Sequence, residues 1–297
     1  MPDASIINLG KLSKPATVLV EKISEAVGGV FKPYQIVRVA KAQAEAEKIQ
    51  AQAKIEITDL QHRAMQRFFE EEGKRQANIE DITQKALPLL KEESKPQDVE
   101  DDWITNFFDK CRVISDPEMQ QLWFKILAGE ANSPGSFSRR TVNLLSDLEK
   151  RDAELFQSLC GFGWNYEEPS SLLYPLVFDV DNEIYTQRDI YYSNLAHLES
   201  LGLVQFDNFL GFILTRRPKQ AILSYFGSRV QLTLPNDENN KLGLGKVLLT
   251  HAGQELTRVC KPKLVEGFLE YAIKHWEEEK LTPKVCEVKE NSSPNLI

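Results

Sequence analysis

The sequence lacks the spaced cysteines and histidines on which most metal sites and disulfide frameworks depend. Its four cysteines are Cys111, Cys160, Cys260 and Cys286, and no two of them form a CxxC pair. This excludes the common zinc-ribbon and thioredoxin spacings and is typical of a reducing compartment. The four histidines show neither HxxxH nor HxH spacing. We therefore expect no metal, no cofactor and four reduced thiols.

Signatures of catalysis are missing as well. No serine lies in a GxSxG elbow. The segment 242–246 (LGLGK) lacks the spacing and the final hydroxyl of a GxxxxGK[ST] phosphate-binding loop. No enzymatic activity is predicted from a motif, and a site that only the fold assembles stays an open alternative.

Long apolar runs and an excess of positive charge are also absent. No charged-then-apolar signal segment opens the chain, and no run of about 18 apolar residues exists, so we expect a cytoplasmic protein with no transmembrane segment. The net charge is −8, and residues 101–200 hold 17 acidic against 8 basic residues. Because nucleic-acid binding needs a cationic surface, any DNA binding should be weak and confined to residues 201–297.

What is present is enough apolar sequence for two domains, since 42% of 297 residues are hydrophobic. Ser13 and Pro15 are typical of a helix start. Apolar residues at helical spacing follow up to residue 30, and Gly28 weakens the far end. This helix either packs in the core of an assembly or lies at a membrane surface, and its mixed polar face favours packing.

Residues 34–73 contain no proline and consist mainly of good helix formers. Their narrow apolar seam is typical of a coiled coil or of a long helix docked on another. We predict self-association through residues 34–73, and the alternative is a helical hairpin within one chain, formed with residues 77–90. The seam comprises Val39, Ala42, Ala46, Ile49, Ala53, Ile57, Leu60, Ala64 and Phe68.

The predicted fold is mainly α with a C-terminal α+β part. The polar segment 91–102, which contains Pro96, is the best domain boundary. In the central part, helices are expected near residues 103–111, 117–127, 138–145 and 146–159. The predicted regions are an N-terminal helical, coiled-coil region (1–95), a central helical domain that forms a bundle (96–165), a winged-helix-like α+β module (166–276) and a disordered tail (277–297).

The winged-helix prediction depends on the order of elements after residue 172. A helix over 187–201, opened by Thr186 and Asp189, ends at Gly202, and a Leu-Thr-x-x-Gly-x-x-Leu turn opens a later helix. The other expected elements are a strand at 173–180, a hairpin of 203–206 with 211–215, strands at 229–234 and 246–250, and helices at 254–259 and 264–276.

Two groups of residues are candidates for a functional site. Arg216, Arg217 and Lys219, expected on a loop, together with Arg229 are candidate contacts for nucleic acid or a partner protein, and a solvated surface cluster is the alternative. The candidate recognition helix itself offers few basic side chains.

The second group surrounds the turn-rich loop AGEANSPGSFSRRT. Trp123, Glu130, Arg139 and Arg140 either form a ligand or partner site or belong to a buried ion-pair network that pins the loop. The pinning interpretation is preferred.

The run DDWITNFFDKCRVISDPEMQQLWFKILAGEANSPGSFSRRTVNLLSDLEKRDAELF, with the opening PATVLVEKISEAVGGVFKPYQIVRVAKAQAEAE, resembles an uncharacterised bacterial family, domain of unknown function 2806. The helical half is loosely similar to abortive-infection-type proteins. The resemblance implies a cytosolic protein and supplies no catalytic residues. The leading hypothesis is a non-enzymatic interaction or assembly protein, and the alternatives are a DNA-binding regulator and an abortive-infection-type effector.

Overall fold

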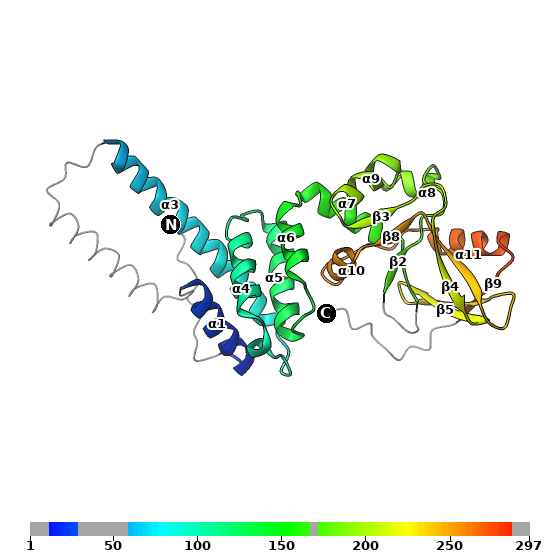
Figure 1. The fold of residues 1–297 in the computed structure, drawn as a ribbon, viewed down its shortest axis with the longest axis horizontal. Coiled ribbons are helices and arrows are strands. Elements are labelled where there is room, and N and C mark those ends of the chain that lie inside the picture. Colours follow the sequence, from blue (N-terminus) through cyan, green and yellow to red (C-terminus); the bar gives the residue numbers. More distant parts are fainter. Residues whose placement is uncertain (1–11, 29–58, 167–171, 287–297) are drawn as a thin grey trace. The chain divides into compact units, whose positions relative to one another are not determined.

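The computed structural model describes residues 12–28, 59–166 and 172–286. The chain forms two compact units, which divide between Ser146 and Asp147 (Figure 1). The division therefore falls at one place rather than at the predicted residues 95 and 165. The segment 91–102 does not separate domains, because it packs within the first unit: Lys95 N–H donates to Ala131 O at 3.0 Å.

The first unit is helical and the second combines helices with strands, so the protein has mixed α and β content. The elements of the first unit are α1 (Lys14–Val27), α3 (Asp59–Ala86), η2 (Leu87–Leu89), η3 (Pro96–Asp98), α4 (Asp101–Cys111), α5 (Pro117–Asn132) and α6 (Arg139–Asp147).

Helix α1 begins and ends as its sequence predicts. The Ser13 side chain accepts a hydrogen bond from Ala16 N–H, and Gly28 ends the helix in the left-handed conformation (φ 81°). Its buried face contacts α4, and Lys22 reaches the loop before that helix, where it donates to Val99 O and pairs with Asp101. Packing against the unit's own core, rather than against a membrane, accounts for its apolar face.

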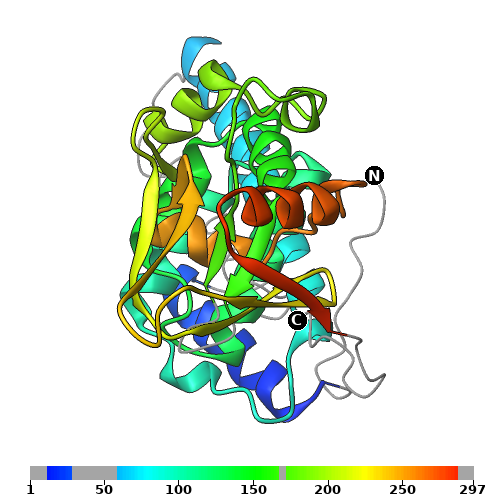
Figure 2. The ribbon, with the colours of Figure 1, turned by 90° about the vertical axis from the view of Figure 1, so that its right-hand side faces the viewer.

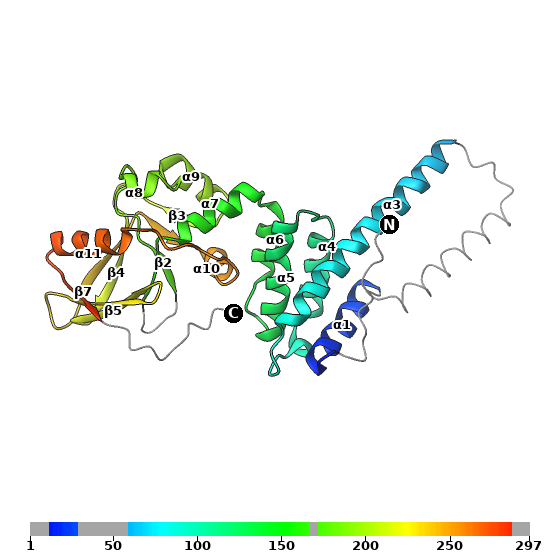
Figure 3. The ribbon, with the colours of Figure 1, turned by 180° about the vertical axis from the view of Figure 1, so that it is seen from behind.

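Helix α3 is continuous from Asp59 to Ala86, so the predicted helix end near Gly73 is wrong. Residues 77–86 continue α3, which also contradicts the predicted hairpin partner. Gly73 costs a helix about 1 kcal/mol relative to alanine. Figures 1 and 3 show the first half of α3 extending past the other helices, and its seam residues Leu60 and Phe68 are 68% and 58% exposed. The seam before residue 59 lies outside the described residues.

Ion pairs along α3 offset part of the cost of Gly73. Arg67 Nε lies 3.5 Å from Glu71 Oε1, and Arg75 pairs with both Glu71 and Glu72. Pairs of this spacing each stabilise a helix by a few tenths of a kcal/mol. The helix therefore continues through Gly73.

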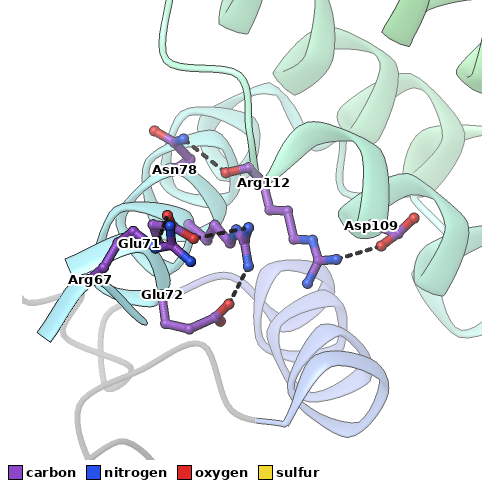
Figure 4. Close-up of polar contacts among 7 residues, drawn as sticks. Arg67, Glu71, Glu72, Asn78, Asp109 and Arg112 are labelled. Atoms are coloured by element: carbon purple, nitrogen blue, oxygen red, sulfur yellow. Dashed lines mark hydrogen bonds and ion pairs between the residues drawn. The ribbon is translucent and has the colours of Figure 1, made fainter. Parts of the chain in front are cut away.

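The second half of α3 is attached to the end of α4. The Asn78 side chain donates to Arg112 O at 2.9 Å, and the Arg112 guanidinium pairs with Asp109, with 2.8 Å between Nη2 and Oδ1 (Figure 4). These contacts close the polar edge of a core built mainly from aromatic rings of α4 and α5. Its ring pairs are Trp103 with Phe107 (5.0 Å between centroids), Phe107 with Phe108 (5.1 Å) and Phe107 with Trp123 (5.1 Å).

The described residues of the second unit, 147–166 and 172–286, form three sheets. The largest is five-stranded, in the order β2-β1-β5-β6-β9, and the pairs β3-β8 and β4-β7 form the other two. The helices are α7 (Lys150–Cys160), α8 (Glu183–Thr186), α9 (Tyr192–Ser200), α10 (His251–Thr257) and α11 (Phe268–Glu278). The strands are β1 (Gly163–Tyr166), β2 (Leu173–Pro175), β3 (Val204–Phe206), β4 (Phe212–Arg217), β5 (Gln220–Tyr225), β6 (Ser228–Thr233), β7 (Asn240–Gly245), β8 (Val247–Leu249) and β9 (Thr282–Cys286).

The predicted hairpin of residues 203–206 with 211–215 is wrong. Strand β3 pairs antiparallel with β8, from Val204↔Leu249 to Phe206↔Val247, and β4 pairs with β7. After β3 the chain therefore forms strands β4 to β7 and then returns as β8, which lies beside β3. We call the intervening residues 207–246 the excursion. Local turn residues could not show this, because the pairing joins strands about 40 residues apart.

The predicted disorder of the tail is wrong for residues 282–286. Strand β9 pairs with β6 through five residue pairs, from Arg229↔Cys286 to Thr233↔Thr282. It is the red strand that follows α11 in Figure 2. Residues 287–297 lie outside the described part of the chain. The sheet packs on α11 through aromatic rings: Trp164 stacks on Tyr225 and meets Trp276 of α11 edge-on, each with 5.0 Å between ring centroids.

Several helix limits differ from the predictions. The predicted helix 187–201 is shorter in the structure. Helix α8 ends at Thr186, Asp189 has φ 61°, and α9 begins only at Tyr192. The Glu149 side chain, rather than Ser146, caps α7.

The last two helices and the first predicted strand also shift. Helix α10 begins at His251, three residues early, because the Thr250 side chain accepts from Gly253 N–H. Helix α11 begins at Phe268, after Gly267 in the left-handed conformation, rather than at residue 264. Strand β2 occupies only the first three residues of the predicted strand 173–180.

Candidate functional site

The buried Glu130 carboxylate holds the loop that follows α5. Its Oε1 accepts from Gly135 N–H at 2.6 Å, and its Oε2 accepts from Phe137 N–H at 2.9 Å. Phe137 O in turn accepts from Trp103 Nε1 at 2.6 Å. Gly129 lets the Phe137 ring lie on α5, since a Cβ there would come within 2.7 Å of it. The contacts that pin the loop therefore include hydrogen bonds from main-chain N–H groups to the Glu130 carboxylate.

The structure does not bring the four predicted loop residues together. Trp123 is buried in the aromatic core, Arg140 is exposed, and the exposed Arg139 pairs with Asp102, with 3.6 Å between Nη1 and Oδ2. A hollow of about 380 Å³ is lined by Glu130 and Arg139 but by neither Trp123 nor Arg140. We interpret this region as a pinned loop rather than a ligand site.

The four predicted basic contacts are also dispersed. Arg216 and Arg217 end strand β4 instead of lying on a loop, and Arg217 lies over the Tyr166 ring, 5.4 Å from its centroid. Lys219 pairs with Asp237 at 2.7 Å.

Arg229 lies apart from Lys219. In the β5-β6 hairpin it faces Ser224, whereas Gln220, next to Lys219, faces Thr233. At about 3.3 Å per residue, the two basic positions are roughly 16 Å apart along the hairpin. Charges separated by more than the Debye length of about 8–10 Å do not act as one patch at physiological salt.

A different surface of the second unit is unusual. The turn between β3 and β4 presents Phe209, 90% exposed, and Leu210, 86% exposed, and Ile213 follows with 53% exposure. We call Phe209, Leu210 and Ile213 the apolar loop patch. Single exposed apolar residues are common, but three within five residues on one turn point to an interaction site.

The turn that carries the patch is held in place by hydrogen bonds. Asp207 Oδ1 accepts from Leu210 N–H at 3.0 Å and Phe209 N–H at 2.9 Å, and these bonds lower the pKa of that carboxyl. Lys246 Nζ donates to Phe209 O at 3.2 Å. Gly211 (φ 67°) ends the turn, where a Cβ would lie 2.5 Å from Gly245 O. The exposed rings and methyl groups therefore stand on a fixed backbone.

The sequence contains a signal for this turn that local reasoning missed. The run Asp207-Asn208-Phe209-Leu210-Gly211 places an Asx-turn residue and a glycine around two large apolar residues. We expected this run to join the two strands of a hairpin, 203–206 and 211–215, and did not identify Phe209 and Leu210 as exposed.

A second hollow, of about 430 Å³, lies between α7 and α9. Within it His197 Nε2 lies 2.7 Å from the buried Asp152, whose other oxygen accepts from Glu149 N–H at 3.0 Å. A carboxylate and an imidazole are here arranged as in a general-base pair. The lining comprises Asp147, Glu149, Arg151, Asp152, Leu155, Asn194, His197 and Leu201 and includes no serine, threonine or cysteine as a nucleophile.

Metal and membrane sites can be assessed for the described residues. Across residues 12–28, 59–166 and 172–286, no group of three or more His, Cys, Asp or Glu side chains is placed to hold a metal ion. Among the helices of those ranges, none combines the length and the apolar character needed to cross a bilayer.

Comparison with known proteins gives one match. A family model described as "Protein of unknown function (DUF2806)" matches residues 62–273. The search of curated proteins finds no match, and neither does the search of solved structures.

Proposed function

Since this chain belongs to the family of proteins of unknown function DUF2806, we propose its function from the geometry: it is an interaction protein whose second unit is a winged-helix-like module that binds a partner protein. The observation that carries the proposal is the apolar loop patch, held rigid and exposed on a turn of that module.

The order of elements supports a winged-helix-like module. Helix α7, strand β2, helices α8 and α9 and strands β3 and β8 come in the order found in winged helices, with β1 inserted after α7 and β4 to β7 inserted between β3 and β8. Strands β3 and β8 are paired, and β2 contacts β8. The excursion 207–246 takes the place of the wing. Helix α9 then corresponds to the recognition helix, and the apolar loop patch lies at the base of the wing.

The surface of this module suits a protein better than DNA. Helix α9 (YSNLAHLES) contains neither lysine nor arginine, although DNA-reading helices depend on such residues. Its first residue, Tyr192, is exposed and packs edge-on against Phe206, 5.3 Å between centroids, just before the patch. Winged helices can serve as protein-binding modules, and aromatic residues are enriched in protein interfaces.

The charges around the patch indicate what the partner presents. Lys246 lies beside it, and Arg216 and Lys241 are exposed further along the β4-β7 ribbon. Asp207, the nearest carboxylate, is engaged by its own turn. An apolar groove with acidic residues at its rim complements this arrangement.

The test places a photo-crosslinking amino acid at position 210 of the full chain in its native host. The control carries it at Glu238, which is exposed on the turn before β7. The proposal requires one nuclease-resistant protein adduct at 210 that is absent at 238. The purified adduct partner should bind the wild type at least tenfold more tightly than Phe209→Asp. Equal adducts at both positions, a nuclease-sensitive adduct, or flotation with lipid vesicles would overturn it.

The finer hypothesis of assembly concerns the first unit. Leu60 and Phe68, which end the predicted seam, are exposed on α3. Their exposure supports a second helix packing there from another copy of the chain. No observation on the described residues favours an abortive-infection effector.

A further inference from the structure

Strand β4 has a strand partner on only one of its two edges within residues 12–28, 59–166 and 172–286. On that side it pairs with β7, and the two strands form a separate ribbon. The isolated bridge between Val177 and Gly245 belongs to β7 and not to β4. An unpaired edge offers main-chain N–H and C=O groups with which another strand can pair.

The side chains of β4 are accessible as well. Ile213 is 53% exposed, and Thr215 and Arg216 are also exposed. Across the ribbon Ile213 faces Gly243, which has no side chain to cover it. An extended segment that approaches this edge therefore meets exposed side chains along most of the strand.

The edge strands of the five-stranded sheet are less suited to pairing. Strand β2 has only three residues, and β9 contains Pro283, which has no N–H to donate. Strand β4 has six residues, Phe212–Arg217, and no proline. Its length of about 20 Å is enough for a short added strand.

Positive charge gathers at the far end of this edge. The register shift between Leu214 and Arg217 leaves Thr215 and Arg216 opposite Lys241 of β7. Arg216 has a left-handed backbone conformation (φ 56°), and a bulge of this kind redirects a side chain. Arg216 and Lys241 are both exposed, and neither forms an ion pair with another residue of the described ranges.

The near end of the edge is basic too. Lys246 Nζ lies beside the apolar loop patch, where it donates to Phe209 O at 3.2 Å. The edge is therefore apolar at the patch and at Ile213, and a basic side chain lies at each end. An extended segment that combines apolar and acidic side chains complements this pattern, whereas a basic segment is repelled by it.

We propose that the partner of the apolar loop patch adds an extended, acidic segment to the open edge of β4 as a further strand. This inference rests on the proposed function and specifies how the partner binds. Main-chain hydrogen bonds hold the segment along β4, and its apolar side chains face Ile213 and the patch. Its carboxylates face Arg216 and Lys241.

The experiment uses the full-length protein and a short fluorescent peptide of alternating glutamate and valine. Fluorescence anisotropy should show that this peptide binds at least about tenfold more tightly than a lysine–valine peptide of the same length. Two further peptides carry N-methyl groups, one on every glutamate and the other on every valine. Because successive N–H groups of a strand point to opposite edges, one of these two should lose binding and the other should keep it. Docking by side chains alone would leave both unchanged.

Hydrogen exchange and matched variants locate the bound peptide. The amides of residues 211–217 should exchange more slowly in the complex, and those of β9 should not change. Arg216→Glu with Lys241→Glu should weaken binding by about tenfold. The control is Arg229→Glu with Lys284→Glu, which makes the same change of charge at exposed positions of β6 and β9 and should bind as the wild type does.

The crosslink at position 210 tests the proposed function separately. If that adduct forms, strand addition alone is overturned by three results: no binding of the glutamate–valine peptide, equal binding of the two methylated peptides, or protection at β9. An adduct that contains a second copy of this chain would overturn the acidic segment as the occupant. Absence of the adduct would overturn both the proposed function and this inference.

Discussion

Asp152 Oδ1 lies 2.7 Å from His197 Nε2, and this contact joins the first turn of α7 to α9. The same carboxylate accepts from Glu149 N–H, so one buried side chain both caps a helix and attaches a second helix to it. The helix that corresponds to a recognition helix is therefore positioned by a side chain that no catalytic motif indicates.

The first prediction concerns this carboxylate. Asp152→Ala should lower the free energy of unfolding of the second unit by about 2 kcal/mol, because it removes a helix cap and the hydrogen-bond partner of His197. His197→Ala should cost less, roughly 1 kcal/mol, since the cap to Glu149 remains. Urea denaturation measures both. Equal losses in the two variants would show that the cap contributes little.

The second prediction concerns the loop after α5. Glu130→Ala should destabilise the first unit by about 2–4 kcal/mol, because Gly135 N–H and Phe137 N–H lose their acceptor. Arg140→Ala, on the exposed side of α6, is the matched control and should stay within about 0.5 kcal/mol. A ligand site at this loop would instead give a variant of normal stability that has lost activity in cells.

The third prediction is a pH dependence in the first unit. Burial raises the pKa of the Cys111 thiol well above its ordinary value of 9.0. The unfolded chain releases this proton as the pH passes that value, while the folded protein keeps it, so stability is lost as the pH rises. Between pH 9 and 10, this thiol should lower the free energy of unfolding of the wild type by up to about 1.4 kcal/mol per pH unit. Cys111→Ala should lack this part of the pH dependence. Urea denaturation at pH 8, 9 and 10 measures this pH dependence in both proteins. If the Cys111 thiol were accessible in the folded protein, the substitution would leave the pH dependence unchanged.

The fourth prediction concerns DNA. Any binding should be weak and detectable only at low salt, because the chain has a net charge of −8 and its basic residues are dispersed. Arg216→Glu with Arg217→Glu should abolish a gel shift, whereas Arg229→Glu, which lies in β6 rather than at the end of β4, should leave most of it. A shift that survives the double change would exclude the end of β4 as the contact.

The fifth prediction concerns self-association. Light scattering should show the wild type larger than one chain at tens of micromolar, and Ile49→Asp with Leu60→Asp should reduce its mass, because a charge buried in an interface costs several kcal/mol. His62→Asp places the same charge about 200° around α3 from Leu60 and should leave the mass unchanged. A wild type that is monomeric at this concentration would contradict the hypothesis.

Helices with strong local signals could be predicted from the sequence. Ser13, Pro15 and Gly28 mark α1, and Asp116 with Pro117 marks the start of α5, because each acts on its own neighbours. The helix through Gly73 could not be predicted, since glycine usually weakens helices and the ion pairs around it offset only part of that cost.

Strand pairing and the sites depended on distant residues. The β3-β8 and β6-β9 pairs join segments more than 40 residues apart, and nothing in either segment names its partner. For the same reason the Asp152–His197 contact was not predicted. The exposure of Phe209 and Leu210 was also unpredictable, because an apolar residue in a sequence is expected to be buried.

The strand order β2-β1-β5-β6-β9 has a consequence for biosynthesis. Residues near 163 and near 286 belong to one sheet, so its last strand can pair only after nearly the whole second unit has left the ribosome. The contacts of the first unit are complete by residue 146, and it can fold while the rest is still being translated. Until β9 arrives, the edge of β6 stays open to other strands, which makes the nascent second unit the part of this chain most dependent on chaperones.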